Sequence, residues 1–288
     1  MQYMSLIKPL TNYLFPEKLL FSLLIFLFCL NVDAEKKRRY EFKYRVDNNS
    51  KVSKKGVKVA FYLPFDRMNY SYLCSHGYEE LSDKLGNRML KVTLPIVAAH
   101  SSETLHVRIS LGDQRTSKKK STENLSEFLK DEKYIEKNTI DLPRTIQAEG
   151  AVNTAEQIYK WIRKNIKRAE YEPNDLGAAW ALDKRSGDCS EQAYLFVALC
   201  RKAGIPARFV EGYFIGKEEK LQLGAFHNWA EFWNGDEWVL SDPHAGFFQE
   251  NYGYYLTTRV LNDSMKDIMK NTHRFRVIEG DVKMRMIE

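Results

Sequence analysis

Two hydrophobic periodicities divide the chain. From residue 38 to about 111, apolar side chains recur at every second position in four runs, at 40–46, 57–63, 89–94 and 105–111. A period of two is typical of strands that bury one face. Several short strands separated by turn residues predict a small antiparallel β-sandwich, which we assign to residues 35–111.

Beyond residue 124 the period lengthens to that of a helix. A first helix has one apolar stripe, formed by Ile158, Trp161, Ile162 and Ile166. A second, over 189–202, is apolar almost all round and should therefore be central in its domain. Strands are expected at 207–215, 226–233, 237–242, 255–260 and 275–278. Helices followed by antiparallel strands predict an α+β domain over 151–288, with 112–150 as a linker and first core segment.

The N-terminus has the pattern of an export signal. Residues 19–30 form an apolar run in which Ser22 is the one polar residue, followed by small residues that include Ala34. A bilayer span needs ~20 apolar residues, whereas the hydrophobic region of a signal peptide needs ~7–15. We therefore expect a signal peptide over 1–34 and an exported protein, periplasmic or extracellular. The alternative is an uncleaved segment that anchors the chain and supplies its one membrane contact.

Charge and cysteine content exclude several classes of protein. The chain has 44 Lys and Arg against 38 Asp and Glu, a net charge of +6. This excess is too diffuse to predict nucleic-acid binding. Of four cysteines, Cys29 lies in the apolar run, which leaves an odd number in the mature chain. A disulfide framework is therefore not expected.

Cys189 is the first candidate for chemistry. It begins the buried second helix, where backbone N–H groups lack partners inside the helix and the helix dipole favours an anion. Such positions favour the reactive thiolate form of cysteine. An ordinary half-buried cysteine is the alternative. Cys200, eleven residues further on, is expected in the core.

A hairpin supplies two further candidates. Residues 234–235 are Asn-Gly, a strong signal for a two-residue turn. In that register His227 faces Asp242 directly, so the carboxylate can accept a hydrogen bond from one ring nitrogen. The other nitrogen then serves Cys189. A thiol nucleophile, its base and the residue that orients the base would give this set.

These residues lie in longer motifs that resemble a known family. GDCSEQAYLFVALCRKAGIPARFVEGYF and HNWAEFWNGDEWVLSDP are similar to the core of the transglutaminase-like superfamily, over roughly 151–246. The resemblance implies a papain-like fold, in which a central helix packs on an antiparallel sheet. It also implies a triad of Cys189 as nucleophile, His227 as base and Asp242 as acid. An N-terminal sandwich is frequent in similar bacterial proteins.

The resemblance leaves the oxyanion donors open. The backbone N–H of Cys189 is one candidate, and Tyr171 or Trp180 is a second, while His244 is expected to border the cleft. Nothing resembles the acidic calcium sites of animal cross-linking members. We therefore expect no metal and no cofactor.

The expected function is thiol-dependent hydrolysis or acyl transfer at amide bonds, through an acyl-enzyme on Cys189. The substrate would be a protein, a peptide or a peptidoglycan-related amide. One alternative is a catalytically idle binding or scaffolding protein of the cell envelope. Another is a metal site built from the same three side chains.

Overall fold

The computed structural model describes residues 38–65, 70–112, 124–147, 149–216, 221–262, 268–270 and 272–288. The predicted signal peptide, 1–34, and part of the predicted linker and first core segment, 113–123, lie outside these residues. None of the helices in the described segments is long and apolar enough to cross a membrane.

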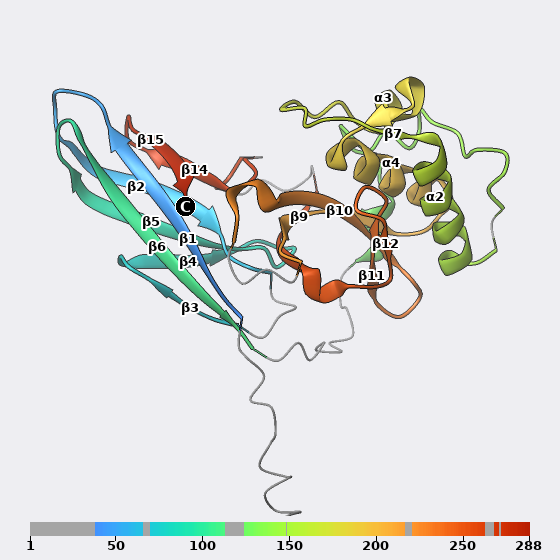
Figure 1. Cartoon of the computed structure of the whole chain (residues 1–288), viewed down its shortest axis with the longest axis horizontal. Helices are drawn as coiled ribbons and strands as arrows, with labels where there is room; N and C mark the ends of the chain where they lie inside the picture. The colour runs from blue at the N-terminus through green and yellow to red at the C-terminus, as the bar shows by residue number, and fades with distance from the viewer. Residues whose placement is uncertain are drawn as a thin grey trace, which may run out of the picture. The chain divides into compact units, whose positions relative to one another are not determined.

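The N-terminal strands form two four-stranded antiparallel sheets (Figure 1). Their order is β15-β1-β6-β3 in one sheet and β14-β2-β5-β4 in the other. The strands from this half are β1 (Arg39–Asn48), β2 (Lys54–Tyr62), β3 (Tyr70–Cys74), β4 (Tyr78–Ser82), β5 (Arg88–Val97) and β6 (Ser101–Leu111). Alternate side chains of β1, from Tyr40 to Val46, are buried as the period of two predicts. Tyr44 of one sheet stacks on Phe61 of the other, so the two sheets share one core.

Each of these sheets is completed by a strand from the far end of the chain. β14 (Phe275–Glu279) pairs with β2, and β15 (Lys283–Ile287) pairs with β1. Figure 1 shows both C-terminal strands, in red, beside the blue N-terminal ones. The expectation that 275–278 joins the sheet of the α+β domain was wrong. A strand sequence specifies which face is buried but not which distant edge it pairs with.

The segment between these strands is the α+β part of the chain. Its sheet has the order β12-β11-β10-β9-β13, with all neighbours antiparallel. The elements are α2 (Ala151–Asn165), β7 (Lys167–Arg168), α3 (Ala178–Lys184), β8 (Ser186–Gly187), α4 (Cys189–Lys202), β9 (Ala207–Phe214), β10 (Phe226–Trp233), β11 (Trp238–Asp242), β12 (Phe247–Phe248) and β13 (Tyr255–Leu261). The predicted α+β class is confirmed.

Helix α4 is the centre of this part, as its composition predicts. Every residue from Ser190 to Arg201 is buried, including Cys200. The helix packs against β9 and β10, with Tyr194 stacked on Phe209. Its first residue is Cys189, so packing fixes the position of the candidate nucleophile.

Candidate active site

The start of α4 is held by a capping box. Asp188 accepts a hydrogen bond from the backbone N–H of Ser190 at 2.7 Å, and Glu191 accepts one from the N–H of Asp188 at 3.2 Å. These bonds satisfy donors that a helix start otherwise leaves free. Gly187 is required here because a Cβ at this position would overlap the Cβ of Glu191. The motif Gly-Asp-Cys therefore sets where the half-buried Cys189 begins the helix.

Asp242 anchors the other half of the site from the end of β11. One of its oxygens, Oδ2, lies 2.6 Å from Nε2 of His227 and accepts a hydrogen bond from the Tyr255 hydroxyl at 2.7 Å. The other, Oδ1, accepts from the backbone N–H of Ala245 at 2.8 Å. Asp242 is fully buried and these groups are its partners, so the carboxylate holds one orientation of the His227 ring. Tyr255 was not foreseen, because nothing in its own segment marks it as a partner of Asp242.

The hairpin that brings His227 and Asp242 together has a different register from the predicted one. Trp233 pairs with Trp238, which leaves a four-residue loop, 234–237. The cause is Asn234, whose side-chain oxygen accepts hydrogen bonds from the N–H groups of Asp236 and Glu237, both at 2.9 Å. Direct pairing of His227 with Asp242 was therefore wrong.

The prediction that both side chains share one face nevertheless holds. Continued along the hairpin, the observed register places Asp242 opposite Trp229, two positions from His227 on the same side of the sheet. A shift of two residues preserves the face, and diagonal neighbours are within reach of long or aromatic side chains. The His227 ring stacks over Trp229, at 6.2 Å between centroids, and reaches the carboxylate diagonally.

Cys189 and Asp242 act together on the charge of His227. Burial lowers the pKa of His227, but hydrogen bonds with Asp242 and Cys189 and the charges of both groups outweigh burial and raise that pKa to about 10. Burial raises the pKa of Asp242, yet the hydrogen bond from His227 brings it below its ordinary value. Since Nε2 is bound to Asp242, Nδ1 is the nitrogen left for the sulfur. The structure thus brings the three predicted side chains together.

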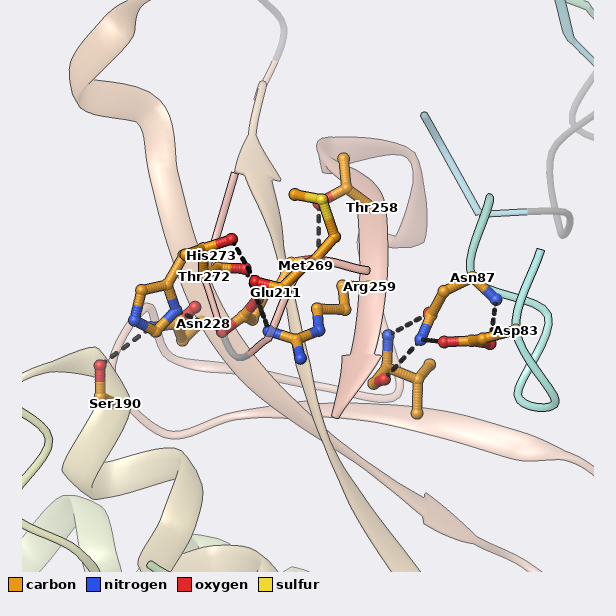
Figure 2. A network of polar contacts seen from close by, with 11 residues as sticks. Asp83, Asn87, Ser190, Glu211, Asn228, Thr258, Arg259, Met269, Thr272 and His273 are labelled. Atoms are coloured by element: carbon orange, nitrogen blue, oxygen red, sulfur yellow. Dashed lines mark hydrogen bonds and ion pairs between the residues drawn. The ribbon is translucent and has the colours of Figure 1, made fainter. Parts of the chain in front are cut away.

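A second contact ties the two elements that carry Cys189 and His227. Nδ2 of Asn228 donates a hydrogen bond of 2.9 Å to Oγ of Ser190, and both side chains are buried (Figure 2). Ser190 directly follows Cys189, and Asn228 directly follows His227. Sequence reasoning missed this pair, because two unremarkable polar residues became partners only through the packing of α4 on β10.

A buried ionic group lies beside Asn228, on the face of the sheet to which the Asn228 side chain points. Glu211 lies opposite Asn228 in the β9–β10 ladder and is fully buried. His273 approaches one of its oxygens at 2.6 Å, and Nη1 of Arg259 lies 3.5 Å from the other (Figure 2). The hydrogen bond to Glu211 raises the pKa of His273. This group joins β9, β13 and the segment before β14 behind the site.

The three secondary candidates lie in different surroundings. The ring of His244 is 5.7 Å from that of His227, so His244 borders the site. Tyr171 is 80% exposed in the loop before α3. Trp180 lies on α3, packed against the main core cluster. No hydrogen bond of the described residues joins Tyr171 or Trp180 to the triad, and their role in oxyanion binding stays a prediction. In the described segments, no group of three or more His, Cys, Asp or Glu residues is arranged to hold a metal ion.

Comparison with known sequences finds a match to part of this chain. Residues 140–243 match the family model of the transglutaminase-like superfamily, which confirms the resemblance for this part of the chain. An uncharacterized protein of Mycobacterium leprae (strain TN) is 29% identical over 101 residues. That match covers 32% of this chain and 35% of the relative, so the chain matches about a third of the relative's length.

Two solved structures match this chain at low sequence identity. A candidate cysteine protease from Cytophaga hutchinsonii is 16% identical, with a TM-score of 0.49, over 86% of this chain and 91% of that one. The periplasmic domain of TgpA from Pseudomonas aeruginosa is 16% identical, with a TM-score of 0.39, over 72% of this chain and 88% of that one.

Proposed function

We propose that this chain, through its transglutaminase-like segment, is a thiol enzyme that acts on amide bonds by way of an acyl-enzyme on Cys189. The observation that carries the proposal is the arrangement around His227. One of its ring nitrogens lies 2.6 Å from the buried Asp242 carboxylate, and the ring also forms a hydrogen bond with the Cys189 side chain. A nucleophile, a base and a group that orients the base are what covalent catalysis at a carbonyl requires.

The reaction uses each side chain in turn. The sulfur of Cys189 attacks the carbonyl carbon of the amide, and the C–N bond breaks as His227 gives its Nδ1 proton to the leaving amine. The acyl group is then held as a thioester. Water or a second amine attacks that thioester while His227 takes up its proton, and the acyl–sulfur bond breaks to return the thiolate beside protonated His227. Water gives hydrolysis and an amine gives transamidation.

Asp242 contributes by fixing the ring and supporting its positive form. A pKa of about 10 keeps His227 protonated at neutral pH, so both ring N–H groups are donors. One points to Asp242 and the other to the sulfur. Because α4 starts at Cys189, its own backbone N–H is the donor that we assign to the oxyanion.

We also propose that the chain acts outside the cytoplasm, on a protein, peptide or peptidoglycan-related amide. Support comes from the N-terminal export pattern alone. N-terminal sequencing of the protein recovered from its native host tests cleavage after Ala34. An intact N-terminus would show that the segment is retained.

The test of the enzyme is alkylation followed by mass spectrometry. Iodoacetamide at neutral pH should label Cys189 first, and the His227→Ala variant should lose most of that labelling. Cys200→Ala is the matched control, since Cys200 is fully buried on the same helix and its removal should leave labelling unchanged. Cys74 is half-buried, and its preferential labelling would overturn the assignment. Fast labelling without turnover of any amide would favour the binding or scaffolding alternative.

A further inference from the structure

Backbone pairing between β7 and β8 fixes the position of Arg168 close to the nucleophile. The short strand β7 pairs in parallel with β8, and Arg168 lies opposite Gly187 in that pair. The next residue, Ala169, donates its N–H to the carbonyl of Gly187 at 3.0 Å. Gly187 is two residues before Cys189. The position of Arg168 is thus fixed relative to the start of α4.

The side chain of Arg168 reaches the opposite half of the site. Its Nη2 lies 3.3 Å from Nδ1 of His244, and the His244 ring is 5.7 Å from that of His227. Backbone pairing with the segment of Cys189 and a side-chain contact with the neighbour of His227 together place the guanidinium at the edge of the triad. The residue is exposed and open to a substrate.

The partner of this guanidinium is a neutral ring. Burial lowers the pKa of His244, and the positive charges of Arg168 and His227 lower it further, to about 4. At neutral pH His244 therefore accepts the hydrogen bond of Arg168 without cancelling its charge. A second guanidinium, that of Arg163, lies against the loop that contains His244 and Gly246. Its Nη1 occupies the place that a Cβ of Gly246 would take.

Two carboxylates of the site, Asp188 and Asp242, are already engaged by other groups. Asp188 accepts the N–H groups of Ser190 and Glu172, at 2.7 and 3.0 Å. Asp242 is bound by His227, Tyr255 and Ala245. Within the described residues, Arg168 forms no ion pair with any carboxylate. An uncompensated arginine at the edge of a catalytic triad is suited to bind an anion from the substrate, and its planar fork matches a carboxylate.

We propose that Arg168 binds a carboxylate of the substrate next to the amide bond that Cys189 attacks. The inference rests on the proposed function and adds a substrate class to it, namely amides flanked by a carboxylate. That carboxylate comes either from the end of a peptide or from an acidic side chain. Both sources present the same chemistry to the guanidinium.

Two alkylating reagents test the proposal without a known substrate. Iodoacetate carries a carboxylate and iodoacetamide does not, while both alkylate the same sulfur. The ratio of their rates at Cys189 should fall roughly fivefold in Arg168→Gln, since a charge-assisted hydrogen bond to the carboxylate is lost. The iodoacetamide rate is the reference in this ratio, because that reagent brings no carboxylate for Arg168 to bind. Arg168→Lys should give an intermediate ratio, because lysine keeps the charge but not the fork.

Lys167→Gln is the matched control. Lys167 is the exposed neighbour on β7, and its loss changes the net charge equally without a contact to His244. Its ratio should stay within about twofold of the wild type, because distant exposed charges are screened. Equal effects of Lys167→Gln and Arg168→Gln, an unchanged ratio in Arg168→Gln, or an equal loss with both reagents would each overturn the proposal.

Failure of the proposed function gives a different result. In that case neither reagent alkylates Cys189 faster than it alkylates denatured protein, in any variant, and the inference falls with it. Where the ratio behaves as expected, digestion of peptides prepared as free acids, as C-terminal amides, and with Glu or Gln beside the cleaved bond separates the two sources of the carboxylate. Cleavage that ignores all of these differences counts against the proposal.

Discussion

Ser190 and Asn228 are joined by a buried hydrogen bond of 2.9 Å, and each directly follows a member of the proposed catalytic pair, Cys189 or His227. The bond therefore links the start of α4 to β10 one residue away from the reacting groups. Oδ1 of Asn228 accepts no hydrogen bond within the described residues. The amide is therefore held through Nδ2, which donates to Oγ of Ser190. We expect this bond to help set the spacing between the sulfur of Cys189 and the ring of His227.

Removing the hydroxyl of Ser190 should slow the site and destabilise the fold. Ser190→Ala leaves a buried amide without an acceptor, at a cost of about 1–3 kcal/mol in the free energy of unfolding. In the double variant Ser190→Ala/Asn228→Leu both polar partners are gone, so most of that stability should return while alkylation of Cys189 stays slow. Denaturant titration and alkylation rates measure the two effects.

Ser241→Ala is the control for this prediction, because Ser241 is also fully buried but its hydroxyl has no hydrogen-bond partner among the residues that the structure describes. It should change neither quantity appreciably. Alkylation that recovers together with stability in the double variant would show that the Ser190–Asn228 bond does not position the pair.

The Tyr255→Phe variant should shift the acid limb of reactivity to higher pH. The Tyr255 hydroxyl donates to Asp242 at 2.7 Å and helps to lower the pKa of that carboxylate. Without this donor, Asp242 takes up a proton at a higher pH and releases His227. The measurement is the rate of Cys189 alkylation against pH.

Tyr254→Phe serves for comparison, since Tyr254 packs against Phe214 next to the site and its hydroxyl has no contact with Asp242 among the described hydrogen bonds. Superimposable pH profiles for Tyr255→Phe and the wild type would show that the Tyr255 hydroxyl does not help to lower the pKa of Asp242.

The contribution of His227 to stability should disappear in alkaline solution. Its pKa is about 10 in the folded protein against an ordinary 6.5. A group whose pKa is raised on folding contributes fully below its unfolded pKa, and its contribution is lost as the pH rises through the folded one. The difference in unfolding free energy between wild type and His227→Gln should therefore shrink from pH 6.5 towards pH 10. Denaturant titrations across this range measure it, and a constant difference would contradict the raised pKa.

Gly212→Ala should be among the most destabilising substitutions near the site. Gly212 pairs with His227, and a Cβ there would overlap the carbonyl oxygen of Leu256 and approach the Trp229 ring to 2.8 Å. Overpacking of this kind costs about 1–3 kcal/mol or more, and the shift of Trp229 should also move His227. Gly77→Ala, with no atom of the described residues within 4 Å of the added carbon, is the matched control. Thermal melts compare the two variants.

Local patterns predicted the parts of the fold that depend on local rules. The strands around Tyr40 and Val59 follow from alternation, and the helix from Cys189 to Lys202 follows from an apolar run that ends before Gly204. The resemblance in the GDC and HNW motifs added the triad. These features need no knowledge of distant partners.

What sequence reasoning missed depends on contacts between distant segments. The hairpin register changed because the Asn234 side chain bonds two backbone groups, a choice between turn types that the Asn-Gly pair does not decide. Tyr255 and the Ser190–Asn228 bond require the packed sheet. The destination of β14 and β15 follows from edges formed more than two hundred residues earlier.

Because the chain is synthesised from its N-terminus, β14 and β15 can join the two sandwich sheets only after the other strands of those sheets have been made. β1 and β2 leave the ribosome before the strands that complete their sheets, and each lacks one neighbour until Phe275 to Ile287 has been translated. The sandwich must therefore stay open while the transglutaminase-like segment is made, and its two edges close only once that intervening segment has brought its ends together. A chain interrupted before Phe275 would carry a complete triad sequence and two unfinished sheets, and such exposed edges are sites of aggregation.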